Sequence, residues 1–282
     1  MQTLIAFLDD LMWTPRIAAA VRTAGMQAEF IGTSSAVWEV LSREGDLPPE
    51  CLTNLRASAG ESWHLMEYLT RRQPVLLLLD LGSAAFPWAR YLPLLTSAPE
   101  TRHMPVLCFG PHVQVEAMKR ARQLGARDVL ARSRMIKDMP ALLRRYAAPG
   151  APPLTPEDCA VPLPPEAQAG IDCFNRQAFF DAHEHLEAAW LADPGPTRAL
   201  YQGILQIGVA YLQIQRRNLP GAVKMFQRAR RWLYPLPDLC RGIDVAALRQ
   251  DSGLAYRTLL SLGETQLDAF PHTLLAPLRL TA

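Results

Sequence analysis

The sequence predicts two domains of different class: a doubly wound five-stranded parallel sheet, followed by an all-α bundle of four or five helices. The chain has 282 residues, about two domains at roughly 100–200 residues each. Seven of the 17 residues from 149 to 165 are proline, which interrupts hydrogen bonding in helices and central strands. Strand and helix patterns alternate before this stretch, and only helical patterns follow it. We therefore expect an α/β domain over residues 1–148, a stiff, extended linker over 149–165 and a helical domain over 166–282.

The first domain has five short apolar runs, each expected to form a strand, with helical patterns between them. Residues 75–79 are continuously aliphatic, as is typical of a parallel strand covered on both faces. Parallel strands need crossover helices, so the alternation predicts a doubly wound sheet. The stretch 34–72 is long for one helix and predicts an insertion or a broken helix. The expected strands cover residues 4–8, 28–31, 75–79, 105–109 and 129–131, and the clearest helices cover 15–24, 113–124 and 135–146.

The second domain has no convincing strand pattern. Residues 200–214 are apolar nearly all round, which marks the central helix of a bundle. Asn175 is expected to cap a helix, Pro220 suits a first helical turn, and Pro194-Gly195-Pro196 separates two helices. The expected helices cover 177–191, 197–216, 220–234 and 244–262, with a shorter one before Phe174.

Composition and charge indicate which binding partners and which cellular compartment to expect for the protein. Hydrophobic residues make up 49% of the chain, and 29 Lys and Arg against 27 Asp and Glu give a net charge of only +2, so we expect no nucleic-acid partner. No apolar run approaches the roughly 20 residues of a membrane-spanning helix, and the first residues lack a secretory signal, so we expect a cytoplasmic protein. The cysteines are odd in number and never spaced as C-x-x-C, which predicts reduced thiols and no cysteine-held zinc. They are Cys51, Cys108, Cys159, Cys173 and Cys240.

Three carboxylates follow strands of the expected sheet. Asp9 and Asp10 come after the first strand, and Asp80 comes after the third. In a parallel sheet these strand ends meet at one edge, where chemistry collects. Clustered carboxylates repel one another unless a hard cation such as Mg²⁺ neutralises them, and an aspartate there can accept a phosphoryl group. The alternative is that the three residues only cap strand ends in solvent.

Residues 1–146 resemble the receiver domain of two-component response regulators, a flavodoxin-like fold. The resemblance rests on the acidic pair, on the lone aspartate after the aliphatic run, and on Gly125-Ala126-Arg127-Asp128 before the fifth strand. It implies that Asp80 is the phosphoacceptor and that Asp9 and Asp10 bind the metal ion.

The chain departs from the receiver pattern at two positions. Receivers place Ser or Thr after the fourth strand, where Gly110 stands here, and Lys after the fifth, where Arg132-Ser133 stands here. Arginine keeps the charge but lacks the compact geometry of an ammonium group. These departures predict a pseudo-receiver that does not depend on phosphorylation, with working phosphotransfer or another flavodoxin-like module as the alternatives.

The helical domain carries the motif His183-Glu184-His185-Leu186-Glu187-Ala188-Ala189-Trp190. His183, Leu186 and Trp190 share one helix face, and His183 and Glu187 are neighbours at i,i+4. The motif resembles the zincin H-E-x-x-H, with Glu187 in place of the second histidine. We interpret His183 and Glu187 as a buried hydrogen-bonded pair in a polar core. A small-ligand pocket and a transition-metal site with Glu184 as the base are the alternatives. The polar core would be completed from the central helix by Gln202, Gln206 and Gln213.

Residues 174–233 are similar to the uncharacterised bacterial and plant family catalogued as domain of unknown function 309, small helical bundles with an H-E-x-x-E-x-x-W motif. The resemblance implies that His183, Glu184, Glu187 and Trp190 carry the family signature, and it brings no established activity. Relatives often have a histidine where Gln213 stands, so one candidate nitrogen ligand is absent here.

The two resemblances together predict a non-enzymatic bacterial signalling or regulatory protein. A degenerate receiver would be coupled to a helical interaction or ligand-binding domain, with a protein partner or a homodimer, since receivers commonly pair through their last helices. We expect no required cofactor. The alternative function is a metal-dependent hydrolase that uses His183, Glu184 and Glu187.

Overall fold

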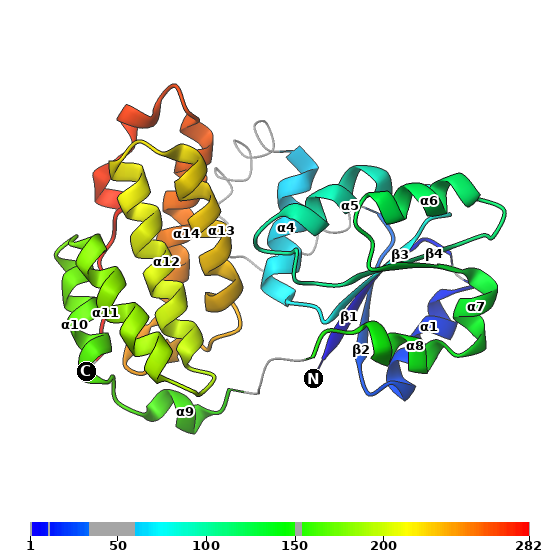
Figure 1. Cartoon of the computed structure of the whole chain (residues 1–282), viewed down its shortest axis with the longest axis horizontal. Coiled ribbons are helices and arrows are strands. Elements are labelled where there is room, and N and C mark those ends of the chain that lie inside the picture. Colours follow the sequence, from blue (N-terminus) through cyan, green and yellow to red (C-terminus); the bar gives the residue numbers. More distant parts are fainter. Residues whose placement is uncertain (1, 11, 34–59, 150–153, 282) are drawn as a thin grey trace. The chain divides into compact units, whose positions relative to one another are not determined.

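The computed structural model describes residues 2–10, 12–33, 60–149 and 154–281, and the side chains of the third range from residue 64 onward. The chain divides into two compact units, residues 1–150 and 151–282 (Figure 1). No helix in the described ranges combines the length and the apolar character that crossing a membrane requires.

The first unit is a five-stranded, all-parallel sheet with the strand order β2-β1-β3-β4-β5. This order is that of the flavodoxin-like class of doubly wound folds. The central strand β3 carries the aliphatic run and is buried along its whole length, which explains its unbroken apolar pattern. The predicted fold class of this unit is therefore confirmed. The strands are β1 (Thr3–Phe7), β2 (Gln27–Ile31), β3 (Leu76–Asp80), β4 (Val106–Gly110) and β5 (Asp128–Ala131).

Helices cover both faces of this sheet. One face packs against α1, α7 and α8, and the other against α4, α5 and α6 (Figure 1). The expected last helix over 135–146 is instead two helices, because Pro140 lacks the N–H that would continue the first one. Residues 34–59, where we expected an insertion or broken helix, lie outside the described residues. The helices are α1 (Thr14–Thr23), α4 (Gly60–Arg72), α5 (Trp88–Ser97), α6 (Val115–Gln123), α7 (Arg132–Lys137) and α8 (Met139–Tyr146).

The second unit is a helical bundle, as predicted, with α12 at its centre. Close packing there depends on glycine: a Cβ at Gly208 would lie 3.3 Å from the ring of Phe174. Phe174, Phe179 and Tyr211 form a cluster of aromatic rings, with centroids 5.3–5.7 Å apart. The helices are α9 (Pro156–Ala160), α10 (Pro165–Asn175), α11 (Phe179–Ala192), α12 (Arg198–Gln215), α13 (Leu219–Leu233) and α14 (Val245–Leu262), followed by the 3-10 turns η1 (Leu267–Ala269) and η2 (His272–Leu274).

A short β-hairpin, which the sequence analysis did not predict, joins α13 to α14. Its strands β6 (Leu239–Cys240) and β7 (Ile243–Asp244) are antiparallel and only two residues long. Between them Arg241 and Gly242 both have positive φ, at 52° and 74°, the conformation that two-residue hairpin turns require. Two-residue strands leave no periodic pattern in the sequence.

The structure corrects the cysteine prediction. Cys159 and Cys240 form a disulfide across 81 positions, whereas Cys108 and Cys173 are free and buried; Cys51 lies outside the described residues. Sequence spacing carries no sign of such a pairing, because it depends on folding α9 against β6. Disulfides are rare in the cytosol, so the expected cytoplasmic location loses the support that reduced thiols gave it.

The linker prediction is also corrected in its second half. Thr155 and Asp158 form a capping box that begins α9, so residues 156–160 are helical rather than extended. The backbone N–H of Arg241 donates to the carbonyl of Cys159 at 2.7 Å, which adds to the disulfide. This part of the proline-rich stretch is therefore packed as part of the helical unit.

Candidate functional site

The three predicted carboxylates lie where parallel-strand topology places them. Asp80 ends β3, and Asp9 and Asp10 follow β1, the neighbouring strand. Asp80 is only 1% exposed, Asp10 is partly buried, and Asp9 is exposed. The alternative that these residues merely cap strand ends in solvent is therefore wrong for Asp80.

Both carboxylate oxygens of Asp80 are engaged by groups of the protein. Oδ1 accepts from the backbone N–H of Gly82 at 2.9 Å. Oδ2 accepts from Nη2 of Arg132 at 2.7 Å, and the same nitrogen lies 3.9 Å from Oδ2 of Asp10. A charge-assisted hydrogen bond of this length is among the stronger polar contacts in proteins. Arg132 is the first residue of α7, so it stands directly after β5.

The surroundings hold the Arg132 guanidinium in this place. Its carbon lies 5.5 Å from the ring centroid of Trp13, a cation–π distance, and Trp13 itself is 6% exposed. A Cβ at Gly82 would lie 3.1 Å from Nη2 of Arg132 and 3.3 Å from Oδ1 of Asp80. A side chain at position 82 would therefore crowd the ion pair, and glycine leaves it room. In the sequence Arg132 is only a departure from the receiver pattern, and no local signal predicts its contact with Asp80.

The other carboxylates have local partners. Oδ1 of Asp10 accepts from the N–H of Met12 at 2.8 Å, and Oδ2 of Asp9 accepts from the N–H of Ala85 at 3.3 Å. At the end of β4, Gly110 offers no hydroxyl, and a Cβ there would lie 3.1 Å from the side chain of Leu81. No side-chain oxygen from that position is therefore available to a phosphoryl group on Asp80.

The donor set decides how well a Mg²⁺ ion fits this edge. Carboxylate oxygens are suitable ligands, and Asp9, Asp10 and Asp80 would supply them. Arg132, however, already donates to Asp80 and approaches Asp10, so a cation would compete with the guanidinium for the same oxygens. Within the described ranges no three His, Cys, Asp or Glu side chains are grouped as metal ligands. The residues therefore fit Arg132 better than a metal ion.

In the helical unit, the structure places His183 and Glu187 on α11 as sequence spacing predicts, but not as a buried pair. Nε2 of His183 lies 3.9 Å from Oε2 of Glu187, beyond hydrogen-bond distance, and the side chains are 37% and 48% exposed. The predicted buried hydrogen-bonded pair is therefore wrong. Helical spacing defines a shared face, but how deeply that face is covered depends on the neighbouring helices.

The other predicted binding residues do not converge on this pair. Trp190 is partly buried, and the guanidinium of Arg198 lies 5.3 Å from its ring centroid. Gln202 and Gln206 are partly buried on α12, and no hydrogen bond in the described ranges joins either of them to His183 or Glu187. Buried atoms without a hydrogen-bond partner among the described residues include Nδ1 of His183, Nε1 of Trp190 and Oε1 of Gln206. The polar core we predicted is not assembled as such.

A largely buried ion pair, which no local sequence pattern predicts, lies at the N-terminal end of α12. Arg241, in the hairpin turn, lies 3.2 Å from Oδ2 of Asp193, with the two side chains 12% and 11% exposed. Arg241 also donates to the hydroxyls of Thr197 and Tyr201 at 2.7 and 2.5 Å. These contacts tie the turn before α12 to the hairpin, which indicates a structural role.

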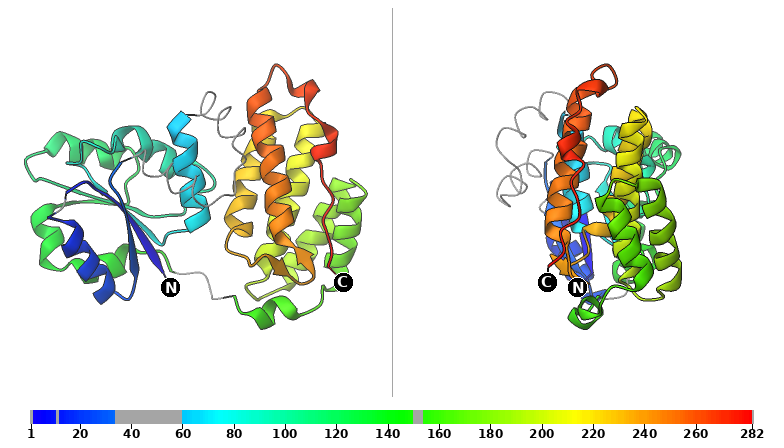
Figure 2. Two further views of the ribbon diagram at one scale, coloured as in Figure 1. Left: turned by 180° about the vertical axis from the view of Figure 1, so that it is seen from behind. Right: turned by 90° about the vertical axis from the view of Figure 1, so that its left-hand side faces the viewer.

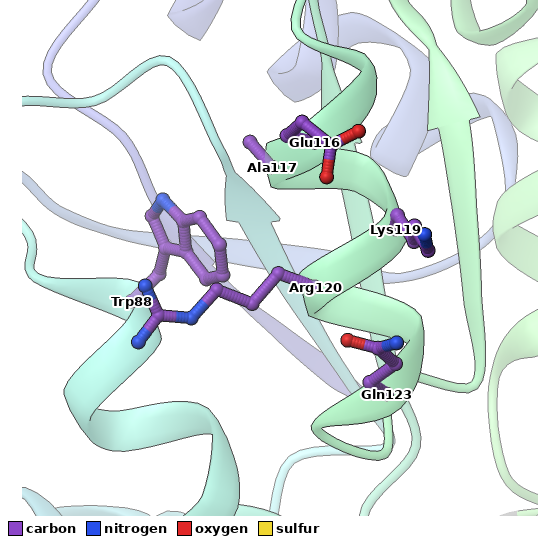
Figure 3. A pocket seen from close by; sticks show the side chains of 6 residues that line it. All are labelled: Trp88, Glu116, Ala117, Lys119, Arg120 and Gln123. Atoms are coloured by element: carbon purple, nitrogen blue, oxygen red, sulfur yellow. The ribbon is translucent and has the colours of Figure 1, made fainter.

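A surface hollow of about 550 Å³ lies on the first unit between α5 and α6. Figure 3 shows Arg120 extending from α6 toward the indole ring of Trp88, which donates to the carbonyl of Leu81 at 3.2 Å. Glu116 and Lys119 contribute opposite charges to its lining. The hollow includes none of the three carboxylates, so it is separate from the Asp80 site.

Comparison with known protein families supports the resemblance of the helical unit. The first unit belongs to the flavodoxin-like class by its sheet order. Residues 167–225 match the family described as Domain of unknown function (DUF309). The matched range includes the His183 motif, and the match confirms the predicted resemblance. No curated protein sequence matches the chain.

Three solved structures of response regulators are similar to about half of the chain. The phosphorylated cyanobacterial phytochrome response regulator RcpA is 14% identical, covering 51% of this chain and 93% of that chain, with a TM-score of 0.37. A response regulator in red light signaling of R. palustris is 13% identical, covering 55% and 100%, with a TM-score of 0.38. The signal receiver domain of a DNA binding response regulator from Colwellia psychrerythraea 34H is 12% identical, covering 51% and 98%, with a TM-score of 0.35.

Proposed function

We propose that the protein is a non-enzymatic regulatory protein with a receiver-like first unit that works without phosphorylation. The helical unit would supply the surface that binds a protein partner, a second copy or a small ligand. The observation that carries the proposal is the ion pair between Asp80 and Arg132, with Nη2 and Oδ2 2.7 Å apart.

Three features of the Asp80 site support this proposal. Phosphoryl transfer to a carboxylate needs a nucleophilic oxygen, and the hydrogen bond that each oxygen of Asp80 accepts, from Gly82 and from Arg132, lowers its nucleophilicity. Asp80 is also 1% exposed, which restricts the approach of a phosphoryl donor. Gly110, at the end of β4, supplies no hydroxyl that could contact a phosphoryl group on Asp80. The guanidinium of Arg132 supplies the positive charge beside Asp80 that a bound cation would otherwise supply.

The test is a phosphorylation assay on the full chain. The protein is incubated with a small phosphoryl donor and Mg²⁺ and then weighed intact by mass spectrometry, beside a functional receiver as the positive control. We expect no mass increase in the protein while the control is modified. A stoichiometric phosphoryl adduct that disappears in Asp80→Asn would overturn the proposal.

The metal-dependent hydrolase remains a separate hypothesis that elemental analysis tests. It needs His183 and Glu187 as ligands and Glu184 as the base, and in the described ranges no third ligand joins them. Protein purified without chelators is measured for transition metals, with His183→Ala as the comparison. Stoichiometric metal that is lost in the variant would favour the hydrolase over the regulatory function.

A further inference from the structure

Residues 275–281 lie as an extended segment between α10 and α14 of the helical unit (Figure 2). Oδ1 of Asn175, the last residue of α10, accepts from the N–H of Leu278 at 2.7 Å, and its Nδ2 donates to the carbonyl of Leu278 at 3.2 Å. Asn175 is thus not the helix cap that the sequence suggested. It pairs with both polar groups of one residue, as a neighbouring β-strand would.

The β-hairpin holds the next residues of this segment. The N–H of Asp244 donates to the carbonyl of Arg279 at 3.0 Å, and the N–H of Thr281 donates to the carbonyl of Gly242 at 2.8 Å. Leu280 and Ile243 form an antiparallel bridge, so the segment adds to the edge of β7. Main-chain pairing of this kind is how many domains bind an extended peptide.

Side chains of the segment divide into anchors and exposed positions. Leu275 and Leu278 are 3% and 5% exposed and pack into the core of the unit. Leu280 is 47% exposed, and Arg279 is 60% exposed while it pairs with Asp251 of α14 at 3.0 Å. The segment therefore presents two apolar anchors three positions apart, followed by a basic residue that meets a carboxylate.

We propose that the groove formed by α10, α14 and the edge of β7 is a peptide-binding site that the chain's own residues 275–281 occupy. Its ligand class is an extended peptide with two leucine-like residues three positions apart and a basic residue next to the second. Asn175 and the hairpin bind the peptide backbone, and Asp251 binds the basic residue. The tethered segment competes at a high effective concentration, so a partner peptide binds when the segment is displaced. This inference does not depend on the state of Asp80.

The test displaces the segment in the full chain and offers a replacement. Leu278→Asp places a charge at the buried anchor, whereas Leu280→Asp places the same charge at an exposed position of the segment and serves as the matched control. The probe is a fluorescent synthetic peptide with the sequence of residues 271–281, and binding is followed by anisotropy. We expect Leu278→Asp to bind the peptide at least tenfold more tightly than the wild type or Leu280→Asp.

A second pair of variants tests the backbone contact. Added to Leu278→Asp, Asn175→Ala is expected to weaken peptide binding about tenfold, whereas Gln168→Ala, on the same helix but away from the segment, leaves it unchanged. Equal peptide binding by wild type and a folded Leu278→Asp overturns the proposal, as does equal binding with and without Asn175. If Leu278→Asp loses its helical circular dichroism and cooperative melting, the segment is an integral part of the core and the proposal is also overturned.

Discussion

Removing the charge of Arg132 is the most direct perturbation of the site, and its cost follows from the burial of Asp80. Arg132→Met keeps an apolar stem against Trp13 but leaves the Asp80 carboxylate, 1% exposed, with one backbone N–H as its partner. Breaking a fully buried ion pair from one side costs about 3–5 kcal/mol. Because Arg132 is 29% exposed, solvent screens part of this interaction, and we expect a loss of about 2–3 kcal/mol in the free energy of unfolding.

A double-mutant cycle separates this pair from general damage. Asp80→Asn keeps the size of the side chain and removes its charge, and with Arg132→Met it leaves no buried charge without a partner. We expect the two substitutions together to cost less than the sum of the single ones, by about 1–3 kcal/mol. Urea unfolding followed by circular dichroism gives all four stabilities. Additivity within about 0.5 kcal/mol would refute the reasoning that Arg132 neutralises Asp80.

Three further predictions concern packing and cysteine chemistry. Cys240→Ser opens a loop of 81 positions and should lower the stability of the helical unit by about 4 kcal/mol in urea unfolding; identical unfolding of the reduced and oxidised wild type would contradict this. Gly170→Ala would place a Cβ 2.7 Å from Cγ of Leu186 and should cost about 1–3 kcal/mol in thermal melts, whereas Gly253→Ala in α14 should not destabilise the protein. Burial raises the pKa of the Cys108 thiol from about 9 to about 12. The stability linked to this thiol is therefore fully present below the pKa of the unfolded thiol and is lost as the pH rises toward 12, because the unfolded chain releases its proton first. Stability that falls as steeply in Cys108→Ala as in the wild type over this range would contradict this prediction.

Much of the Asp80 site could be predicted because parallel-strand topology links sequence position to place. An aspartate at the end of a central apolar strand must lie at the carboxyl edge of the sheet, beside the residues that follow the neighbouring strand. The contact with Arg132 spans 52 positions and depends on where a long, flexible side chain turns at the start of α7. No local pattern encodes that direction, so the ion pair was missed although both residues had been singled out.

For the helical motif, the sequence predicts which residues share a helix face but not how deeply that face is buried. The i,i+4 spacing places His183 and Glu187 on one face of α11, as predicted, because helical geometry alone determines it. Whether that face is buried depends on how α11 packs against its neighbours, and the structure leaves both side chains more than one-third exposed. Similarly, the position of Asn175 in the sequence predicts a helix cap, whereas its hydrogen-bond partner Leu278 lies 103 positions away.

Local periodicity in the sequence was enough to determine the sheet class and the five strands of the first unit, and the largely helical nature of the second. These depend on which residues must be buried on one face of each element, a property that neighbouring residues share. Tertiary structure alone decided the Asp80–Arg132 pair, the Cys159–Cys240 disulfide and the position of the final segment against Asn175. Each of these joins residues far apart in the chain, and each forms only when the packing of whole elements brings its two partners within bonding distance.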